Sequence, residues 1–576
     1  MPGTSTAAIR AAGAARGDLE ATRAACEGMH AMIPGVLHGF LLVLGGGFDA
    51  GLATIRAEDL EQHLRALAGP EREGRDTPSQ GLSEAAHFLE QRYRDAGWLP
   101  APDSLDTWKA LSKRPLPAMP ATSSATAGAE APAGTYLRPY VRRLPRPDEK
   151  ACYLRLDLGS GAPREFVYGE DFVPLAHCEG EVKGELCFAG FAIESKKESY
   201  DDLEGVKLKG RIALVFETEP DNAKRFDGPE LTPDASLWKK LEHLRAAQAA
   251  GVLFVRRPVA SDPKRKDAEA WDEHGLAFRH TWAQWNDGQP AEERPKDKDT
   301  LPCLEISAEC ASALAGVDVV ATLRAMDKSA RPNKLAWKGR QVLLRSKCES
   351  AEVEIDNVVA WLPGSDAKLA AEVLVIGAHY DHVGVDTRGR IGFGADDNAS
   401  GSAGLIELAQ ALAQAHPRRS ILACSFSGEE DGLLGSQALA QRLPVEKSRI
   451  VAMINMDMIG RGDKDEVAVL GIVQNPALEK LLERARKLTP TGITKMVLRQ
   501  GEDLFQRSDH YSFHQLGVPV LFFFEGLPID RNPDYHTWRD TVDKLDLEKM
   551  RRTSVLVYAT AWLLANDDDR PPPSRE

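Results

Sequence analysis

Apolar residues follow three different patterns along the chain, and each pattern is typical of a different structure. Between about residues 54 and 98 they recur every three or four positions, as in "AEDLEQHLRALAG" and "GLSEAAHFLEQRYRDAGW", and this predicts two amphipathic helices. From about 172 to 326, short apolar runs such as "ELCFAGFAI" and "GRIALVFE" alternate with turns, which predicts short strands. From about 350 to 566, apolar runs of strand length alternate with helical stretches.

The third pattern predicts the fold class. The runs "EVLVIGA", "SILACSF", "VAMINMDM" and "VPVLFFF" are apolar throughout, as strands buried on both faces are. Helical stretches such as "SGSAGLIELAQALAQA" separate them. We therefore expect an α/β fold whose sheet is mixed but mostly parallel and is flanked by helices.

The length of 576 residues is too great for a single core, so we expect several domains. We expect an N-terminal leader at 1–53, followed by the first part of the α/β domain at 54–171, which includes a Pro/Ala-rich linker at 114–134. A β-rich insert follows at 172–326 and contains a charged excursion at 260–299. The α/β core occupies 327–566, and a disordered tail occupies 567–576.

The leader contains one apolar run, "IPGVLHGFLLVLGGG", at residues 33–47. It is shorter than the roughly 20 residues that a spanning helix needs, so we expect no stable membrane span. It fits the apolar centre of a secretory signal, with the small residues "AGLA" ending at Ala53 as the cleavage site. We expect export to the periplasm or the exterior; the alternative is a buried N-terminal helix in a cytoplasmic protein.

Charge and cysteine content exclude other classes. The formal net charge of −14 disfavours nucleic acid as a partner. The eight cysteines contain no Cys-x-x-Cys pair, which argues against a thiolate zinc site and a dense disulfide framework. Cys178 with Cys187, and Cys303 with Cys310, are the pairings that sequence proximity brings to mind, and the sequence does not decide them.

Carboxylates and imidazoles follow the predicted strands. In open parallel sheets, ligands bind just beyond the carboxyl ends of the strands. Every strand of the α/β core is followed there by such a side chain, in the segments "HYDHVG", "GADDNASGS", "SGEEDG", "NMDM" and "DYHTW". The candidate residues are His379, Asp381, Asp397, Glu429, Glu430, Asp457 and His536.

Carboxylates gathered in one crevice repel each other, and bound divalent cations remove that cost. The nitrogen and oxygen donors suit Zn²⁺, with Co²⁺ or Mn²⁺ as substitutes. Two histidines and several carboxylates exceed the needs of one four-coordinate ion. The set is sufficient for two Zn²⁺ ions per chain that share a bridging carboxylate, roughly 3.5–4 Å apart.

The motifs "GAHYDHVG", "GADDNASG", "SGEEDGLLGS", "NMDMIGR" and "DYHTWRDT", in this order, resemble the co-catalytic zinc aminopeptidase family, which includes bacterial leucyl aminopeptidases, glutamate carboxypeptidase and the transferrin receptor. The resemblance is strongest over residues 350–566. It also extends to the β-rich insert, which is similar to the protease-associated domain of such peptidases. It implies a hydrolase that acts on peptides with a free N-terminus.

The resemblance implies a role for each residue. His379 and Asp457 would bind one zinc ion, and Glu430 and His536 would bind the other. Asp397 would bridge both ions. Glu429 would be the general base, and Asp381 would orient His379. All these positions are filled, which argues against a non-catalytic binding protein of the same fold.

Some features leave alternatives open. Trp538 stands where the family commonly has proline, which affects the pocket wall. A carboxypeptidase, a dipeptidase or a glutaminyl cyclase could use the same site. A carboxypeptidase needs a basic pocket, and Arg461 and Arg507 lie near the motifs, but the sequence does not place them in the pocket.

Overall fold

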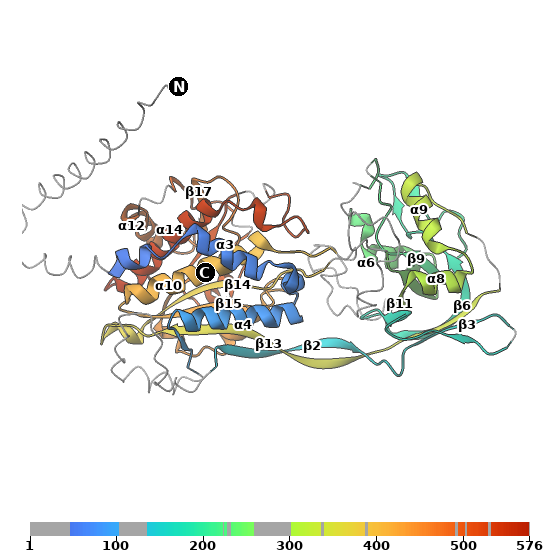
Figure 1. Cartoon of the computed structure of the whole chain (residues 1–576), viewed down its shortest axis with the longest axis horizontal. Coiled ribbons are helices and arrows are strands. Elements are labelled where there is room, and N and C mark those ends of the chain that lie inside the picture. The colour runs from blue at the N-terminus through green and yellow to red at the C-terminus, as the bar shows by residue number, and fades with distance from the viewer. Residues whose placement is uncertain are drawn as a thin grey trace, which may run out of the picture.

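The computed structural model describes residues 47–102, 135–159, 161–222, 224–226, 232–257, 301–335, 339–385, 390–489, 493–501, 504–527 and 532–574. The expected linker at 114–134, the excursion at 260–299 and the apolar run up to residue 46 lie outside this part. The described chain forms two bodies, each built on its own sheet. A long two-stranded ribbon of β2 and β13 runs from one body to the other (Figure 1).

The larger body contains a nine-stranded sheet in the order β1-β13-β15-β14-β16-β19-β17-β18, with β2 paired to β13. The central strands β15, β14, β16 and β19 are parallel, and β13 and β17 run antiparallel to their neighbours β15 and β19. The prediction of a mixed, mostly parallel sheet is therefore confirmed for its centre. The strands are β1 (Leu99–Pro100), β2 (Leu137–Pro147), β13 (Cys348–Leu362), β14 (Val373–His379), β15 (Ser420–Phe426), β16 (Ile450–Met456), β17 (Glu466–Leu470), β18 (Lys495–Val497) and β19 (Val520–Phe524).

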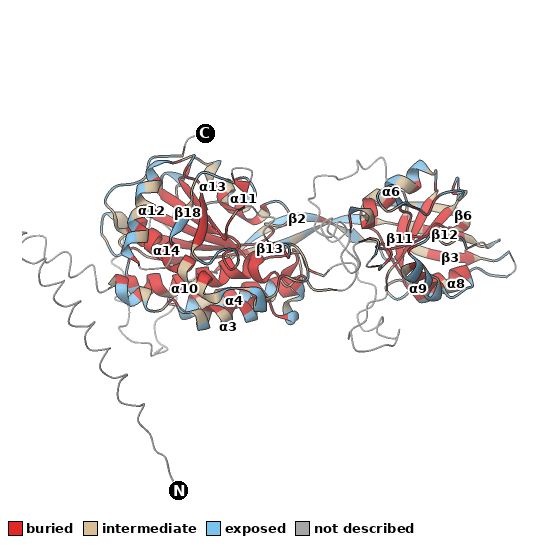
Figure 2. Cartoon of the chain, turned by 90° about the horizontal axis from the view of Figure 1, so that it is seen from above, coloured by how far each residue is buried: buried red, intermediate tan, exposed pale blue. Residues whose placement is uncertain are grey.

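Helices cover both faces of this sheet, and buried residues fill the strands between them (Figure 2). Alternate residues of β14 point to opposite faces: Leu374 and Ile376 join one core, whereas Val373 and Val375 join the other. The first core is covered by α3 (Ala57–Leu67), α4 (Gln80–Asp95), α10 (Gly401–Ala415), α12 (Ala477–Leu488) and α14 (Leu547–Asn566). The second is covered by α11 (Leu434–Gln441) and α13 (His510–His514).

The smaller body contains an eight-stranded sheet in the order β4-β3-β12-β6-β9-β10-β11-β5. This sheet extends beyond the insert expected at 172–326 in both directions. It includes β3, which precedes that range, and β12, which follows it, and these two strands pair with each other. Its strands are β3 (Tyr153–Asp157), β4 (Arg164–Glu165), β5 (Phe172–Pro174), β6 (Gly180–Phe188), β9 (Ile212–Phe216), β10 (Gly251–Val255), β11 (Cys303–Ile306) and β12 (Gln341–Ser346). Its helices are α6 (Leu237–Ala246), α8 (Ala308–Ala315) and α9 (Val319–Ser329), and β7 (Glu194–Ser195) pairs with β8 (Tyr200–Asp201).

Both ends of the described chain pack on the larger body. Residues 47–52 are helical, and Phe48 stacks on Tyr558 with ring centroids 5.2 Å apart. Cleavage at Ala53 would remove this contact. Near the other end, for which the sequence predicts disorder, the Ser574 hydroxyl donates to the Val518 carbonyl. No helix within the described ranges is both long enough and apolar enough to cross a membrane.

Candidate metal centre

The parallel strands bring the predicted site residues to one edge of the sheet. His379 is the last residue of β14, and Asp457 directly follows β16. Glu429 and Glu430 lie in the loop after β15, between Gly428 and Gly432, and both of these glycines have positive φ. Asp397 lies in the turn Ala395–Ser400 before α10, and His536 lies in the loop that follows β19.

Asp397 stands between the two histidines. Its Oδ1 lies 3.3 Å from Nε2 of His379, and its Oδ2 lies 3.1 Å from Nε2 of His536. Each histidine also faces a second carboxylate: Asp457 Oδ1 lies 3.2 Å from His379 Nε2, and Glu430 Oε2 lies 2.9 Å from His536 Nε2. The five residues therefore form two groups of three donors that have Asp397 in common.

These separations fit metal coordination. Donor atoms that bind one tetrahedral ion with bonds of about 2.0 Å lie about 3.3 Å from one another. The four distances between histidine nitrogens and carboxylate oxygens fall between 2.9 and 3.3 Å. Moreover, Nε2 of His536 is buried and has no partner with hydrogen-bond geometry, although two carboxylate oxygens are close. A cation between these atoms would satisfy the nitrogen lone pair and both carboxylates.

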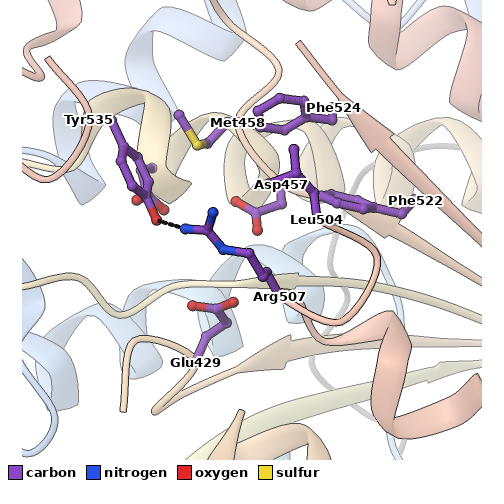
Figure 3. Close-up of a pocket in the computed structure, with 9 residues that line it drawn as sticks. Glu429, Asp457, Met458, Leu504, Arg507, Phe522, Phe524 and Tyr535 are labelled. Carbon is purple, nitrogen blue, oxygen red and sulfur yellow. Dashed lines mark hydrogen bonds between the residues drawn. The ribbon is translucent and has the colours of Figure 1, made fainter. Parts of the chain in front are cut away.

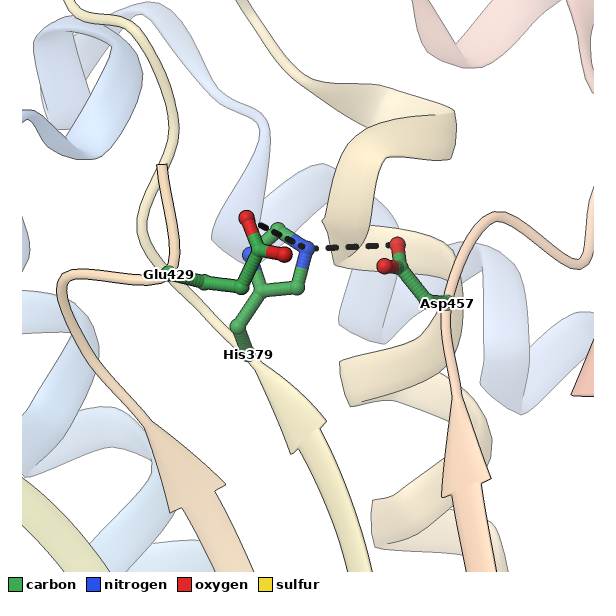
Figure 4. A group of neighbouring side chains, drawn as sticks. All are labelled: His379, Glu429 and Asp457. Carbon is green, nitrogen blue, oxygen red and sulfur yellow. Dashed lines mark hydrogen bonds and ion pairs between the residues drawn. The ribbon is translucent and has the colours of Figure 1, made fainter. Parts of the chain in front are cut away.

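Glu429 is placed differently from these five residues. Its Oε2 lies 4.0 Å from His379 Nε2, farther than Asp457, and Figure 4 shows the two carboxylates approaching the imidazole from different sides. Although Glu429, His379 and Asp457 are close enough to bind one ion together, the longer distance suits a group that acts through a water molecule. Burial, together with the neighbouring Asp457 and Glu430, raises the pKa of Glu429 well above its usual value, which makes it a stronger base.

The charges around the histidines favour a cation. Burial alone would lower the pKa of His536, but Glu430 and Asp397 raise it to about 10. Burial likewise opposes the charged form of Glu430, yet His536 and His382 bring its pKa down to about 2. The pKa of Asp397 is held well below its usual range by His379 and His536, against the effect of burial. The carboxylates thus stabilise positive charge at the point between the histidines, where a metal ion would supply it.

Asp381 supports the site in two ways. Its Oδ1 lies 3.5 Å from Nδ1 of His379, which is the ring nitrogen that faces away from Asp397. The same carboxylate accepts hydrogen bonds from the backbone N–H groups of Glu429 and Glu430, at 3.2 and 3.3 Å. The second contact was not foreseen from the sequence, and it makes Asp381 a residue that positions both the imidazole and the loop.

His382 is a site residue to which the sequence analysis gave no role. Its Nδ1 lies 2.8 Å from Oε1 of Glu430, and 3.8 Å from Oδ2 of Asp397. His382, Asp397 and Glu430 could therefore form a metal group of their own. We favour the group with His536, because His536 is close to both carboxylates while His382 is within bonding distance of only one. The motif "HYDH" carries the signal that could have identified His382.

Three further residues form hydrogen bonds that position the candidate ligands. The Arg75 guanidinium is fully buried and donates to the backbone carbonyls of Tyr380 and Gly394, so it joins the segment that follows His379 to the segment that precedes Asp397. The Asp540 carboxylate accepts from the backbone N–H of Asp397 at 3.0 Å. The Ser508 hydroxyl donates to Oδ2 of Asp457 at 2.7 Å. Arg75 lies about 300 positions before the motifs, which is why no local pattern indicates it.

A pocket opens beside these residues. Its apolar wall consists of Met458, Leu504, Phe522 and Phe524. Figure 3 shows the Arg507 guanidinium between Glu429 and Tyr535, and its Nη2 donates to the Tyr535 hydroxyl at 3.3 Å. The pocket is therefore apolar on one side, and one guanidinium and three carboxylates line its polar side. The residues that line it are Asp397, Glu429, Asp457, Met458, Leu504, Arg507, Phe522, Phe524 and Tyr535.

The other two residues raised by the sequence lie outside that lining. Arg461 forms an ion pair with Asp534, with Nη1 2.7 Å from Oδ2. Trp538 is 37% exposed, and the guanidinium of Arg390 lies 5.5 Å from the centre of its ring. Of the two arginines, only Arg507 is thus in a position to meet a substrate in the pocket.

The chain has recognisable relatives. Residues 357–561 match the sequence profile of Peptidase family M28. A "Probable leucine aminopeptidase" of Arthroderma benhamiae is 32% identical over 215 residues, which are 36% of this chain and 57% of that protein. A "Probable zinc metalloprotease" of Pyrenophora tritici-repentis is 28% identical over 255 residues, which are 37% of this chain and 52% of that protein. The chain spans little more than half the length of the curated relatives it matches.

Among solved structures, an aminopeptidase from Aneurinibacillus sp. strain AM-1 is 20% identical with a TM-score of 0.44, over 92% of this chain and 98% of that chain. A zinc aminopeptidase from Bacillus subtilis is 18% identical with a TM-score of 0.48, over 91% of this chain and 98% of that chain.

Proposed function

Since residues 357–561 belong to Peptidase family M28, we propose that the chain is a metal-dependent aminopeptidase that removes N-terminal residues from peptides. The observation that carries the proposal is the position of Asp397, whose two oxygens face two histidines at 3.3 and 3.1 Å. Relatives named leucine aminopeptidase and zinc metalloprotease support the reaction class and the choice of zinc.

The residues would hold two zinc ions. His379, Asp457 and one oxygen of Asp397 would bind the first, and His536, Glu430 and the other oxygen of Asp397 would bind the second. Co²⁺ and Mn²⁺ prefer similar nitrogen and oxygen donors and are candidates for substitution. Bound divalent cations supply Lewis acidity, which lowers the pKa of water and polarises a carbonyl oxygen.

The protein's own groups would handle the proton. Glu429 accepts a proton from the attacking water and then donates it to the leaving amine, as general acid–base catalysis requires. Its raised pKa suits the first step, because a stronger base takes the proton more readily than an ordinary glutamate does. Asp381 positions Glu429 by accepting a hydrogen bond from its backbone N–H. The substrate's first side chain would lie against Met458 and Phe524 in the pocket.

The test is release of the first residue from amino-acid p-nitroanilides by the purified chain. The assay is run as isolated, after chelation, and after Zn²⁺ is added back, with an N-acetylated substrate as control. Loss on chelation, recovery with zinc and no turnover of the blocked substrate are the expected results. Two bound metals without any cleavage of free-amine substrates would contradict the aminopeptidase assignment.

Arg507 favours a second candidate, a dipeptidase. A dipeptide carries a free carboxylate one residue beyond the cleaved bond, and a guanidinium beside the catalytic glutamate is suited to receive it. In a carboxypeptidase, the Arg507 guanidinium would bind the carboxylate of the C-terminal residue that is removed. Comparing Leu-Gly with Leu-Gly-amide and leucine p-nitroanilide separates a dipeptidase from an aminopeptidase, because only the dipeptidase needs the free carboxylate.

The smaller body is proposed to be a protease-associated domain that binds or covers substrate without chemistry of its own. The β2–β13 ribbon connects it to the site. The Tyr140 hydroxyl in β2 donates a hydrogen bond to the backbone carbonyl of Ser427, two residues before Glu429. We also propose that the protein is exported. Export is tested by fractionating cells that express the full chain, with sequencing of the mature N-terminus.

A further inference from the structure

Two buried cysteines, Cys178 and Cys303, lie together in the smaller body, although the sequence raised each of them with a different partner. Cys178 and Cys303 are both fully buried in the same apolar cluster. The Cys303 thiol donates to the Leu301 carbonyl at 3.0 Å. Burial raises the pKa of the Cys303 thiol, and the Cys178 thiol is close enough to raise it further. The backbone N–H of Cys303 also donates to the Cys178 carbonyl at 3.1 Å, so the two main chains are in direct contact.

The two pairings of neighbours in sequence are excluded by the fold. Cys187 lies near the far end of β6 (Gly180–Phe188), and an extended strand rises about 3.3 Å per residue, which places it roughly 20 Å beyond Cys178. Cys310 belongs to the apolar cluster on the opposite face of the sheet from Cys303. Cys178 and Cys303, by contrast, share one apolar cluster and a direct backbone hydrogen bond.

We propose that Cys178 and Cys303 form a disulfide bond when the protein folds in an oxidising compartment. The two thiols lose two protons and two electrons, and a disulfide oxidant such as oxidised glutathione takes them up and becomes two thiols. The backbone contact brings the two α-carbons within the range that a disulfide spans without rearrangement of the main chain.

The bond would tie together two segments that are distant in sequence. Cys178 lies in the turn between β5 and β6, whereas Cys303 begins β11. The bridge encloses residues 179–302 and limits the freedom of the unfolded chain, which is the main source of stabilisation by disulfides. It also secures the edge strand β5, which has only three residues and one neighbouring strand. This inference is independent of the proposed activity.

Peptide mapping of the full chain tests the linkage. The chain is refolded in a mixture of oxidised and reduced glutathione, its free thiols are alkylated, and it is digested with trypsin and a glutamate-specific protease. These cuts place Cys178 on residues 171–179 and Cys303 on residues 299–305, and they separate both from Cys187 and Cys310. We expect one cross-linked species that joins these two peptides and disappears on reduction. Alkylation of both thiols, or a link from either one to a different cysteine, overturns the proposal.

Thermal unfolding gives a second test. Oxidised protein should melt roughly 5–15 °C above reduced protein, and this difference should vanish in Cys178→Ser and in Cys303→Ser. Cys310→Ser is the matched control, since Cys310 is equally buried in the same body but lies on the other face, and it should keep the difference. Comparing redox states within one variant removes any effect of the serine itself. An equal melting temperature for oxidised and reduced wild-type protein contradicts the inference.

Discussion

His382 and His536 hold the two oxygens of one carboxylate: Nδ1 of His382 lies 2.8 Å from Oε1 of Glu430, and Nε2 of His536 lies 2.9 Å from Oε2. Only Oε2 then lies beside His536, where the second ion is proposed. His382 fixes the rotation of the carboxylate and so decides which oxygen is presented. Its ring is completely buried, so it has no other orientation available without repacking.

Replacing His382 by alanine should therefore weaken one metal site selectively. We expect metal affinity on the Glu430 side to fall about 10- to 100-fold, the usual effect of removing a group that orients a ligand, while the first ion is retained. His382→Asn should recover much of the loss because its amide can donate to Oε1. Competition with a fluorescent chelator measures both ions. Equal weakening of the two ions would show that His382 acts on the whole site and not through Glu430.

Glu429→Gln should preserve metal binding and lower kcat by about 10²- to 10⁴-fold, since the amide cannot accept the proton. Steady-state assays with leucine p-nitroanilide and elemental analysis of the same preparation check both statements. Glu483→Gln, on the surface of α12, is the matched control and should behave as wild type. Turnover close to normal in Glu429→Gln rules out this residue as the base.

Asp397→Ala should lose both ions, because its two oxygens face the two histidines separately. The expected metal content after dialysis is below one ion per chain, compared with two in the wild type. Asp569→Ala, an exposed carboxylate near the C-terminus, controls for the change of charge. A variant that keeps two ions per chain refutes the bridging role.

Arg507→Met should discriminate between substrates. The guanidinium in the pocket would bind a free carboxylate, and a hydrogen bond to a charged group contributes about 1.5–3 kcal/mol, or roughly 10- to 100-fold in kcat/KM. We expect this loss for Leu-Gly and little loss for Leu-Gly-amide. An equal loss for both substrates would mean that Arg507 acts through Tyr535 or the catalytic groups. Arg461→Met, whose parent side chain is paired with Asp534, is the control.

Lys240 makes the smaller body sensitive to pH. The side chain is fully buried and donates to the Phe216 carbonyl, and burial lowers its pKa to about 7, even though Glu219 and Glu217 favour the charged form. Unfolded lysine has a pKa of about 10.4, so between pH 7 and 10 the unfolded state binds more protons than the folded state. Stability must then rise with pH in this window, by up to about 1.4 kcal/mol per unit.

The check is urea unfolding of the full chain between pH 7 and 10, in the wild type and in Lys240→Met. The variant should lose this positive slope. Because the fully buried charge is equally protonated in both states below pH 7, the lysine contributes no slope there. Asp202, Glu217, Glu219 and Arg257 surround it and are present in both proteins, so the difference between the two curves reports on the lysine. Identical slopes in the two proteins would contradict the assignment.

The sequence alone determined the centre of the fold and indicated the residues that meet at the candidate metal centre. A strand buried on both faces must be apolar along its whole length. Continuous apolar runs in the sequence therefore predict the four strands β14, β15, β16 and β19. Because the carboxyl ends of parallel strands lie at one edge, His379, Glu429 and Asp457 could be expected to meet although they are far apart in the chain. Both conclusions rest on local patterns, because each strand and the site residue at or just after its end are contained in a short stretch of sequence.

Only the tertiary structure decided which supporting residues reach those ligands. Arg75 donates to backbone carbonyls more than 300 positions away, which no local pattern indicates. Asp540 lies within the motif "DYHTWRDT", but only the fold shows that its carboxylate accepts a hydrogen bond from the backbone N–H of Asp397. The thiol contact between Cys178 and Cys303 likewise replaced two pairings based on closeness in sequence. Burial selects such contacts, because a charged or polar group removed from water must find a partner wherever the folded chain provides one.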